Sequence, residues 1–282
     1  MLTRSRARKF VNMLVAALAL YAGVLLLLIL VGLPDRVMLW PQIGPIEANG
    51  AARVLLPWNG NELEIWTARH NHEPDAYILR FYGNADRADR WVADEVSALP
   101  IAAEMWGVNY PGFGGSTGPS SLKGIGDSAL IAYDALSKMS GDKPILVFGT
   151  SMGTTAALRV AAERKVAGVF LHNPPALRSI IVGDHGFWNL WLLAYPLSLR
   201  VPASLDSIAN AGASRAPAIF LMSGEDEIVR YPYQQQVFDA YRGSKHAIVL
   251  PHSRHNDPIP GSVREEIDQR LLQIIHSSKV SR

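Results

Sequence analysis

The hydrophobic pattern begins with one long apolar segment near the start of the chain. Residues Phe10–Leu33 include no charged side chain, and Leu25–Val31 is an unbroken run of leucine, isoleucine and valine. About 20 apolar residues cross a bilayer as a helix, whereas the apolar part of a secretory signal spans only about 7 to 15 residues. We therefore predict a transmembrane anchor over residues 10–33. The small-residue pattern Ala17-Leu18-Ala19 leaves a cleaved signal peptide as the alternative.

After the apolar segment, prolines and glycines predict an irregular linker over residues 34–50. Short apolar runs then alternate with longer amphipathic ones. The predicted strands are Arg53–Leu56, Leu63–Ala68, Ala76–Tyr82, Ala102–Asn109, Ile145–Phe148, Val166–Leu171, Ala218–Met222 and Ala247–Leu250. The predicted helices are Asp86–Leu99, Ile125–Met139, Met152–Arg164, Tyr233–Arg242 and Val263–Ile275.

This alternation predicts an α/β domain over residues 51–282, with a mostly parallel eight-stranded sheet and helices on both of its faces. No helix separates the first two strands, so we expect them to form an antiparallel hairpin at one edge. The alternation breaks over residues 174–209, which are rich in aromatic residues and predict one or two short cap helices. These aromatics either pack the cap onto the sheet, or line an apolar acyl pocket or contact lipid.

Charge and composition narrow the class of protein. The net charge is +2, with Arg4, Arg6, Arg8 and Lys9 all in the first nine positions, so the body offers no basic surface for nucleic acid. These residues form a basic cytoplasmic N-terminus, residues 1–9, and the positive-inside rule then places the following domain on the extracytoplasmic side, the periplasm in a bacterium. Cysteine is absent, which excludes disulfides, zinc–thiolate sites and a thiol nucleophile.

Two copies of the G-x-S-x-G pattern offer candidate nucleophiles, at Ser116 and Ser151. A nucleophile elbow requires a buried strand before the serine and a helix directly after it, so that the sharp turn exposes the hydroxyl. Ser151 follows the apolar run Ile145–Phe148 and precedes a helical segment, whereas Ser116 lies between Pro111 and Pro119. We therefore predict Ser151 as the nucleophile and a substrate-side loop around Ser116.

A serine hydroxyl needs a base, and the base needs an orienting acid. Acid candidates follow an apolar strand in Ser223–Val229, and base candidates follow the next strand in Pro251–Asp257. Asp226 and Glu227 compete as the acid, and His255 and His252 as the base. Other histidines, such as His172 and His185, are interpreted as surface or cap residues.

From Arg53 to the C-terminal helix the chain resembles the α/β-hydrolase family, in particular its membrane-anchored, serine-aminopeptidase and lysophospholipase-like branch. The motifs that carry the resemblance are Asp226-Glu227-Ile228-Val229, His255-Asn256-Asp257 and the loop from Asn109 to Gly118. The resemblance implies Asp226 as the acid and His255 as the base. One departure keeps Glu227 and His252 open: a single residue separates Gly224 from Asp226, where relatives have two.

An acyl-transfer site also needs donors for the oxyanion of the substrate. The backbone N–H of Met152, directly after the nucleophile, is one candidate. Relatives have H-G-N-A after the third strand, where this chain reads Tyr82-Gly83-Asn84-Ala85. The resemblance thus implies the N–H of Asn84 as the second donor, with that of Ala85 as the alternative, and the change from histidine to Tyr82 raises the question of how the loop is held.

The sequence therefore predicts a membrane-tethered serine hydrolase acting on a carboxylic ester or thioester, with a small-molecule or lipid-like acyl substrate. A serine peptidase or amidase is the second hypothesis, because the same triad cleaves both kinds of bond. A non-catalytic scaffold of the same fold is the third. No group of residues has metal-ligand spacing, so we expect neither a metal nor an organic cofactor.

Overall fold

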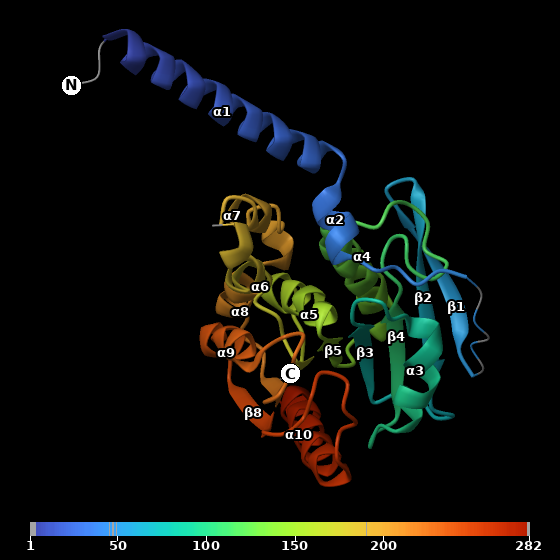
Figure 1. Ribbon diagram of the computed structural model, residues 1–282. Helices are drawn as coiled ribbons and strands as arrows, with labels where there is room; N and C mark the ends of the chain where they lie inside the picture. Colours follow the sequence, from blue (N-terminus) through green and yellow to red (C-terminus); the bar gives the residue numbers. More distant parts are fainter. Residues whose placement is uncertain (1–3, 45, 47, 49, 190, 281–282) are drawn as a thin grey trace.

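The computed structural model describes residues 4–44, 46, 48, 50–189 and 191–280. The first three positions of the predicted cytoplasmic segment and residues 45, 47 and 49 of the predicted linker lie outside the described residues. In Figure 1, helix α1 (Arg4–Leu30) projects away from a body built around one sheet. It is the one helix of the described chain that is long and apolar enough to cross a membrane, over Arg6–Leu30.

The segment after α1 differs from the predicted irregular linker, because Leu33–Met38 forms the short helix α2. Gly32, in a left-handed conformation with φ of 67°, ends α1 earlier than the predicted Leu33 and begins α2. A proline in the first helical turn forfeits no hydrogen bond, and Asp35 and Arg36 have the charges that suit the two helix ends. Asp35 also accepts the backbone N–H of Leu122 at 2.9 Å, which connects α2 to the body.

The sheet has eight strands in the order β1-β2-β4-β3-β5-β6-β7-β8. Strand β2 runs antiparallel to both β1 and β4, and the remaining pairs are parallel, so the predicted edge hairpin is confirmed. The strands are β1 (Ala52–Trp58), β2 (Asn61–Arg69), β3 (Ala76–Phe81), β4 (Ala103–Val108), β5 (Ile145–Thr150), β6 (Gly168–His172), β7 (Ala218–Ser223) and β8 (Lys245–Leu250).

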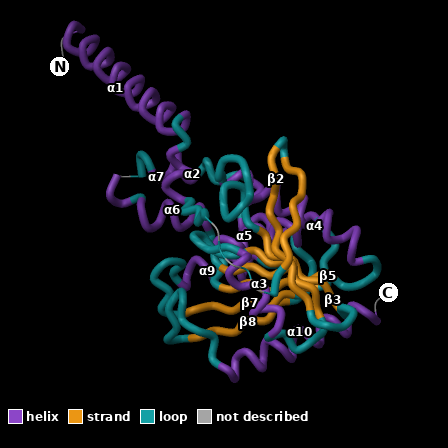
Figure 2. Tube along the Cα trace, turned by 90° about the vertical axis from the view of Figure 1, so that its right-hand side faces the viewer, coloured by secondary structure: helices purple, strands orange, loops and turns teal. Residues whose placement is uncertain are grey.

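Two hydrophobic cores sandwich the sheet, as the predicted fold requires, and Figure 2 shows the strands between layers of helix. Adjacent residues such as Leu146 and Val147 enter opposite cores, since successive side chains of a strand point to opposite faces. One face is covered by α4 (Leu122–Ser140), α5 (Met152–Glu163), α8 (Ser207–Ala213) and α9 (Tyr231–Ala240). The other face is covered by α3 (Ala88–Ser97) and α10 (Gly261–Val280).

The cap between β6 and β7 has more helical turns than the one or two that were predicted. It comprises α6 (Leu177–His185), η1 (Phe187–Asn189), α7 (Ala194–Ser198) and η2 (Ala203–Leu205). Helix α8 was not predicted, because its only large apolar residue, Ile208, is exposed and leaves no periodic apolar pattern. The side chain of Asp206 accepts the N–H of Ala209 at 3.1 Å and so begins this helix.

Candidate active site

Ser151 occupies the turn between β5 and α5, at the carboxyl edge of the sheet. Its φ of 50° and ψ of −124° lie in a region that non-glycine residues rarely adopt, which is typical of a functional turn held by its surroundings. The Ser151 N–H donates to the carbonyl oxygen of His172 at the end of β6, at 2.8 Å. The Ser151 side chain is half-buried and therefore keeps access to solvent.

The glycines on either side of this turn are required by packing. A Cβ at Gly153 would lie 2.3 Å from the carbonyl oxygen of Phe81, and one at Gly149 would lie 2.6 Å from the Cα of Thr154. Both obstacles are backbone atoms, which cannot rotate away. The two glycines thus let α5 approach β3 and β5 closely enough to form the turn.

We expect Gly153→Ala to lower the free energy of unfolding by about 1–3 kcal/mol or more, because the added methyl overpacks rigid backbone. The matched control is Gly261→Ala at the start of α10, where nothing lies within 4 Å of the new Cβ; there we expect a change below about 1 kcal/mol. Thermal unfolding of the two full-length variants in detergent micelles measures the difference. Equal melting temperatures would contradict the packing role of Gly153.

Three side chains from distant segments form a continuous hydrogen-bonded chain beside this turn. His255 Nε2 lies 3.1 Å from Ser151 Oγ, and His255 Nδ1 lies 2.6 Å from Asp226 Oδ2. Asp226 follows β7 and His255 follows β8, so the parallel strands deliver both residues to the same edge as Ser151. The Asp226 side chain is fully buried and that of His255 is 7% exposed, which shields their interaction from water.

The carboxylate of Asp226 is fixed by its own loop. Its Oδ1 accepts the backbone N–H groups of Ile228 at 2.8 Å and Val229 at 2.7 Å, which leaves Oδ2 for the imidazole. Gln234 of α9 also donates to Oδ2 at 3.3 Å and to the carbonyl of Val229 at 2.6 Å. Gln234 was not predicted, since a glutamine in an amphipathic helix carries no signal of this role.

The alternative acid and base residues lie outside this chain of hydrogen bonds. Glu227 is exposed, and its carboxylate faces the backbone N–H of His255 at 3.4 Å rather than the imidazole. Hydrogen bonds from its own backbone N–H and from that of His255 lower the pKa of Glu227. The side chain of His252 is 90% exposed and pairs with Glu225 at 3.0 Å.

The loop with Asn84 and the start of α5, which carry the predicted oxyanion donors, both adjoin Ser151. Gly83 packs against the serine, because a Cβ added there would be 3.6 Å from Ser151 Cβ, and the peptide N–H of Asn84 follows directly. Met152 is the first residue of α5. Within the described part of the chain, neither the Asn84 nor the Met152 N–H donates a hydrogen bond. Both are therefore free to donate to a ligand at Ser151.

The loop that presents Asn84 is held by the segment that follows α1. The Asn84 amide donates to the carbonyl of Met38 at 2.6 Å and accepts the N–H of Trp40 at 2.9 Å. These are the residues that end α2 and follow it, so the segment after α1 contacts the loop directly. This contact could not be predicted, since the segment was expected to be irregular.

Tyr82 is a buried support of the same loop. Its hydroxyl donates to Glu95 at 3.1 Å, and its carbonyl accepts the hydroxyl of Tyr110 at 2.8 Å. Arg80 holds Glu95 through two 2.8 Å hydrogen bonds, and its guanidinium lies 4.5 Å from the centre of the Tyr82 ring. Burial, followed by the charge of Glu95, raises the pKa of Tyr82 well above its usual value, so the hydroxyl remains a donor.

Ser116, in the second G-x-S-x-G copy, has a structural environment. Its hydroxyl accepts the backbone N–H of Glu64 at 2.7 Å and donates to the carbonyl of Asn109 at 2.6 Å, and the residue is buried. Glu64 in turn accepts the Asn109 amide at 2.6 Å and the N–H of Gly115 at 2.7 Å. The glycines of this loop therefore wrap a buried carboxylate, and the serine is committed to backbone partners.

His172 was interpreted as a surface or cap residue, and that interpretation is wrong. It ends β6, pairs with Thr150 of β5 in register and lies close enough to His255 for the charge of that ring to act on it. Burial, followed by the Arg80 guanidinium and His255, lowers the pKa of His172 from 6.5 to about 3. His172 is therefore a neutral neighbour of the site. His185 does lie in the cap, at the end of α6.

This environment predicts a measurable acid sensitivity. Between pH 6.5 and about 3 the unfolded chain protonates this histidine and the native chain does not, so the free energy of unfolding falls as the pH is lowered. We expect His172→Phe to reduce that loss, whereas His276→Gln, at an exposed position, leaves it unchanged. Melting temperatures at pH 4.5 and 7.5 measure the effect. The same pH dependence in His172→Phe as in the parent chain would contradict it.

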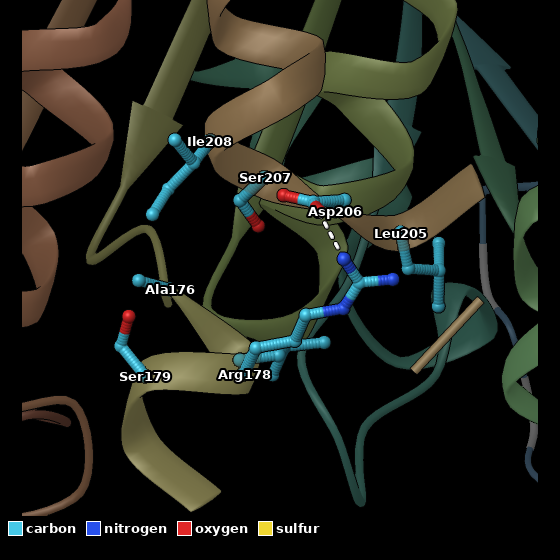
Figure 3. Close-up of a pocket in the computed structure, with 8 residues that line it drawn as sticks. Ala176, Arg178, Ser179, Leu205, Asp206, Ser207 and Ile208 are labelled. Carbon is cyan, nitrogen blue, oxygen red and sulfur yellow. Dashed lines mark hydrogen bonds and ion pairs between the residues drawn. The ribbon is translucent and has the colours of Figure 1, made fainter. Parts of the chain in front are cut away.

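A small cavity lies beneath the start of the cap, between α6 and α8 (Figure 3). Its lining includes Arg178 and Asp206, which form an ion pair at 2.6 Å, and also Ala176, Ser179 and Ser207. Its volume of about 10 Å³ suits one water-sized molecule. Neither Ser151 nor Asp226 nor His255 lines this cavity, so it is not an acyl-binding site for Ser151.

Comparison with known proteins bears on the fold of the chain. Residues 78–214 match the family model described as the alpha/beta hydrolase fold. The uncharacterized protein Rv2307c of Mycobacterium tuberculosis is 27% identical over 250 residues, covering 84% of this chain and 86% of its own length.

Among solved structures, the esterase Pf2001 of Pyrococcus furiosus has a TM-score of 0.62 at 16% identity and covers 86% of this chain and 97% of its own. The acylaminoacyl peptidase of Pyrococcus horikoshii has a TM-score of 0.59 at 14% identity, over 79% of this chain and 40% of its own. At these identities the likeness concerns the fold alone. With the family match, the sheet order and the strand–serine–helix turn, it shows that the chain has the α/β-hydrolase fold.

Proposed function

We propose that the protein is a membrane-tethered serine hydrolase that cleaves a carboxylic ester or thioester through an acyl-enzyme intermediate. One observation carries the proposal: Ser151, His255 and Asp226 form a hydrogen-bonded chain of 3.1 and 2.6 Å at an accessible turn. Nucleophile, base and orienting acid in this order are the parts that acyl transfer requires. The hydrolase fold, shared with esterases and peptidases, supports the same reading.

In the first half of the reaction, the Ser151 oxygen attacks the substrate carbonyl carbon while His255 Nε2 takes the hydroxyl proton. Asp226 accepts the Nδ1–H and stabilises the imidazolium that forms. The carbonyl oxygen becomes an oxyanion, for which the N–H groups of Asn84 and Met152 are the donors, and removal of one such donor typically costs about 3–4 kcal/mol. His255 then returns its proton to the leaving group, and the acyl group stays on Ser151.

In the second half of the reaction, a water molecule enters the site that the leaving group has vacated. His255 removes a proton from the water as its oxygen attacks the acyl carbon, and returns that proton to Ser151 Oγ as the ester bond breaks. The acid product leaves and the hydroxyl is restored. No step requires a metal or an organic cofactor.

The proposed substrate has an acyl chain, since an anchoring helix and an aromatic cap accompany the site. The test compares full-length protein in detergent micelles on p-nitrophenyl acyl esters of increasing chain length and on aminoacyl anilides. We expect ester hydrolysis that rises with acyl length. A clear preference for the anilides would replace the ester proposal by a peptidase, and hydrolysis of neither would favour a scaffold.

We also propose that α1 remains uncleaved as a signal anchor, with the hydrolase domain on the extracytoplasmic side. Arg4, Arg6, Arg8 and Lys9 precede the uncharged part of the helix, Phe10–Leu30. Alkaline phosphatase fused to the C-terminus in a bacterial host is expected to be active, and the full-length mass is expected to persist. A cytoplasmic reporter would reverse the orientation, and loss of the first residues would identify a signal peptide.

A further inference from the structure

The outer end of the cap exposes large apolar side chains to an unusual extent. Six of them form what we call the cap tip, and the most exposed, Trp188, retains 87% of its accessible surface. The cap-tip residues are Phe187, Trp188, Trp191, Leu192, Tyr195 and Leu199. Between Phe187 and Leu199 the sequence includes no charged residue. A water-exposed face of this kind is costly unless something apolar covers it.

The cap tip lies beside the membrane helix. In Figures 1 and 2, α7 lies on the side of the body from which α1 emerges. The hydroxyl of Tyr21 in α1 donates to the carbonyl oxygen of Leu192 in the cap tip. Tyr21, Leu25 and Leu28 are partly covered while most other α1 residues before Leu28 are exposed. Their helical spacing places this contact on one face of the C-terminal half of α1, while the N-terminal half projects away from the body.

This contact sets the depth of the cap tip relative to the apolar span. Tyr21 precedes the last residue of α1, Leu30, by nine residues, which is about 13 Å along a helix axis. Both residues belong to the candidate span Arg6–Leu30. A cap tip that touches Tyr21 is therefore level with the lipid-facing part of the helix, not with the water beyond its end.

We propose that the cap tip is a second membrane contact, inserted among the lipids of the leaflet next to the hydrolase domain. This inference rests on the membrane anchoring in the proposed function and deepens it. Tryptophan and tyrosine are the side chains enriched where lipid meets water. Continuity with a spanning helix favours lipid over a second copy of the chain, because the bilayer that surrounds α1 reaches the adjoining cap tip.

The position of the cap tip indicates where the substrate comes from. The cap begins directly after β6, whose last residue, His172, accepts the N–H of Ser151. The segment after α1 contacts Asn84 at the same edge of the sheet. An inserted cap tip thus places the carboxyl edge of the sheet, with Ser151, against the bilayer surface. The substrate class that fits this placement is an acyl ester dissolved in the membrane.

Because the chain has no cysteine, a single introduced cysteine gives a unique labelling site. Full-length Trp188→Cys carries an environment-sensitive fluorophore and is reconstituted in nanodiscs of phosphatidylcholine and phosphatidylglycerol, with or without nitroxide-labelled acyl chains. Met139→Cys is the matched control, an exposed apolar residue near the end of α4. Leu14→Cys in α1 reports on anchoring itself.

We expect a blue-shifted label at position 188 that the nitroxide lipids quench by roughly twofold, as for groups about 5–10 Å below the lipid surface. The label at position 139 stays unquenched and the one at 14 is quenched. An unquenched label at 188 with a quenched one at 14 overturns the proposal while anchoring stands, and a blue shift without quenching overturns it in favour of a protein contact. An unquenched label at 14 overturns anchoring and cap insertion together. Ester hydrolysis is assayed on the same samples. Its presence or absence tests the proposed reaction separately from the quenching of the three labels.

Discussion

Ser151→Ala is expected to reduce kcat for an acyl ester by about 10⁴-fold or more while leaving the fold intact, since removal of a triad member costs this much in serine hydrolases. The alanine deletes only a hydroxyl whose side-chain partner is His255. The strained turn is held by the packing of Gly149 and Gly153, which the substitution leaves unchanged. The measurements are ester hydrolysis and the melting temperature of the full-length variant.

The chain supplies its own matched control in the second copy of the motif. Ser116→Ala deletes an identical hydroxyl, but one that bonds only to the backbone of Glu64 and Asn109. We expect it to lower the stability by about 1–3 kcal/mol and to retain kcat per folded molecule. Substantial hydrolysis by Ser151→Ala, or inactivity of a folded Ser116→Ala, would show that the wrong serine has been assigned.

Asp226→Asn is the second change with a large expected effect, about 10⁴-fold in kcat. The asparagine oxygen can still accept the N–H groups of Ile228 and Val229, which places its NH₂ group against His255 Nδ1. Nδ1 must then accept, so the ring proton moves to Nε2, which can no longer take the proton of Ser151. The KM is expected to change far less, because the buried carboxylate does not reach the substrate.

Glu227→Gln is the control for Asp226→Asn, since it makes the same chemical change one residue further along. The exposed Glu227 carboxylate contacts only backbone near His255, so we expect kcat within about twofold of the parent. A large loss in Glu227→Gln together with a small one in Asp226→Asn would exchange the two assignments.

Much of the fold could be predicted because its signals are local. Parallel strands buried on both faces, such as β5 and β7, read as short apolar runs, and all eight strands were predicted within a few residues. Helices with an apolar stripe, such as α10, were equally visible. Helix α8 was missed because alanine, glycine and asparagine give no stripe, although the capping Asp206 was available as a signal.

The three side chains that meet at the turn, those of Ser151, His255 and Asp226, could be predicted as a group because strand–turn context and order along the chain are linear features. The residues that hold these side chains and the neighbouring loop in place could not be predicted. Gln234 reaches Asp226 only after α9 has packed on β7, and Asn84 meets Met38 and Trp40 only through the fold. His172 looked like any other histidine, because its burial beside Arg80 and His255 depends on β3, β6 and the loop after β8 coming together. Support of this kind depends on contacts between residues distant in the chain.

The most direct test of the central claim is the site at which a fluorophosphonate becomes covalently attached to the full-length protein. After labelling and digestion, mass spectrometry of the peptides identifies the modified residue. The hydrogen-bonded chain of Ser151, His255 and Asp226 predicts a single adduct on Ser151. Folded protein without any adduct, or with the adduct on Ser116, would contradict the proposed chemistry.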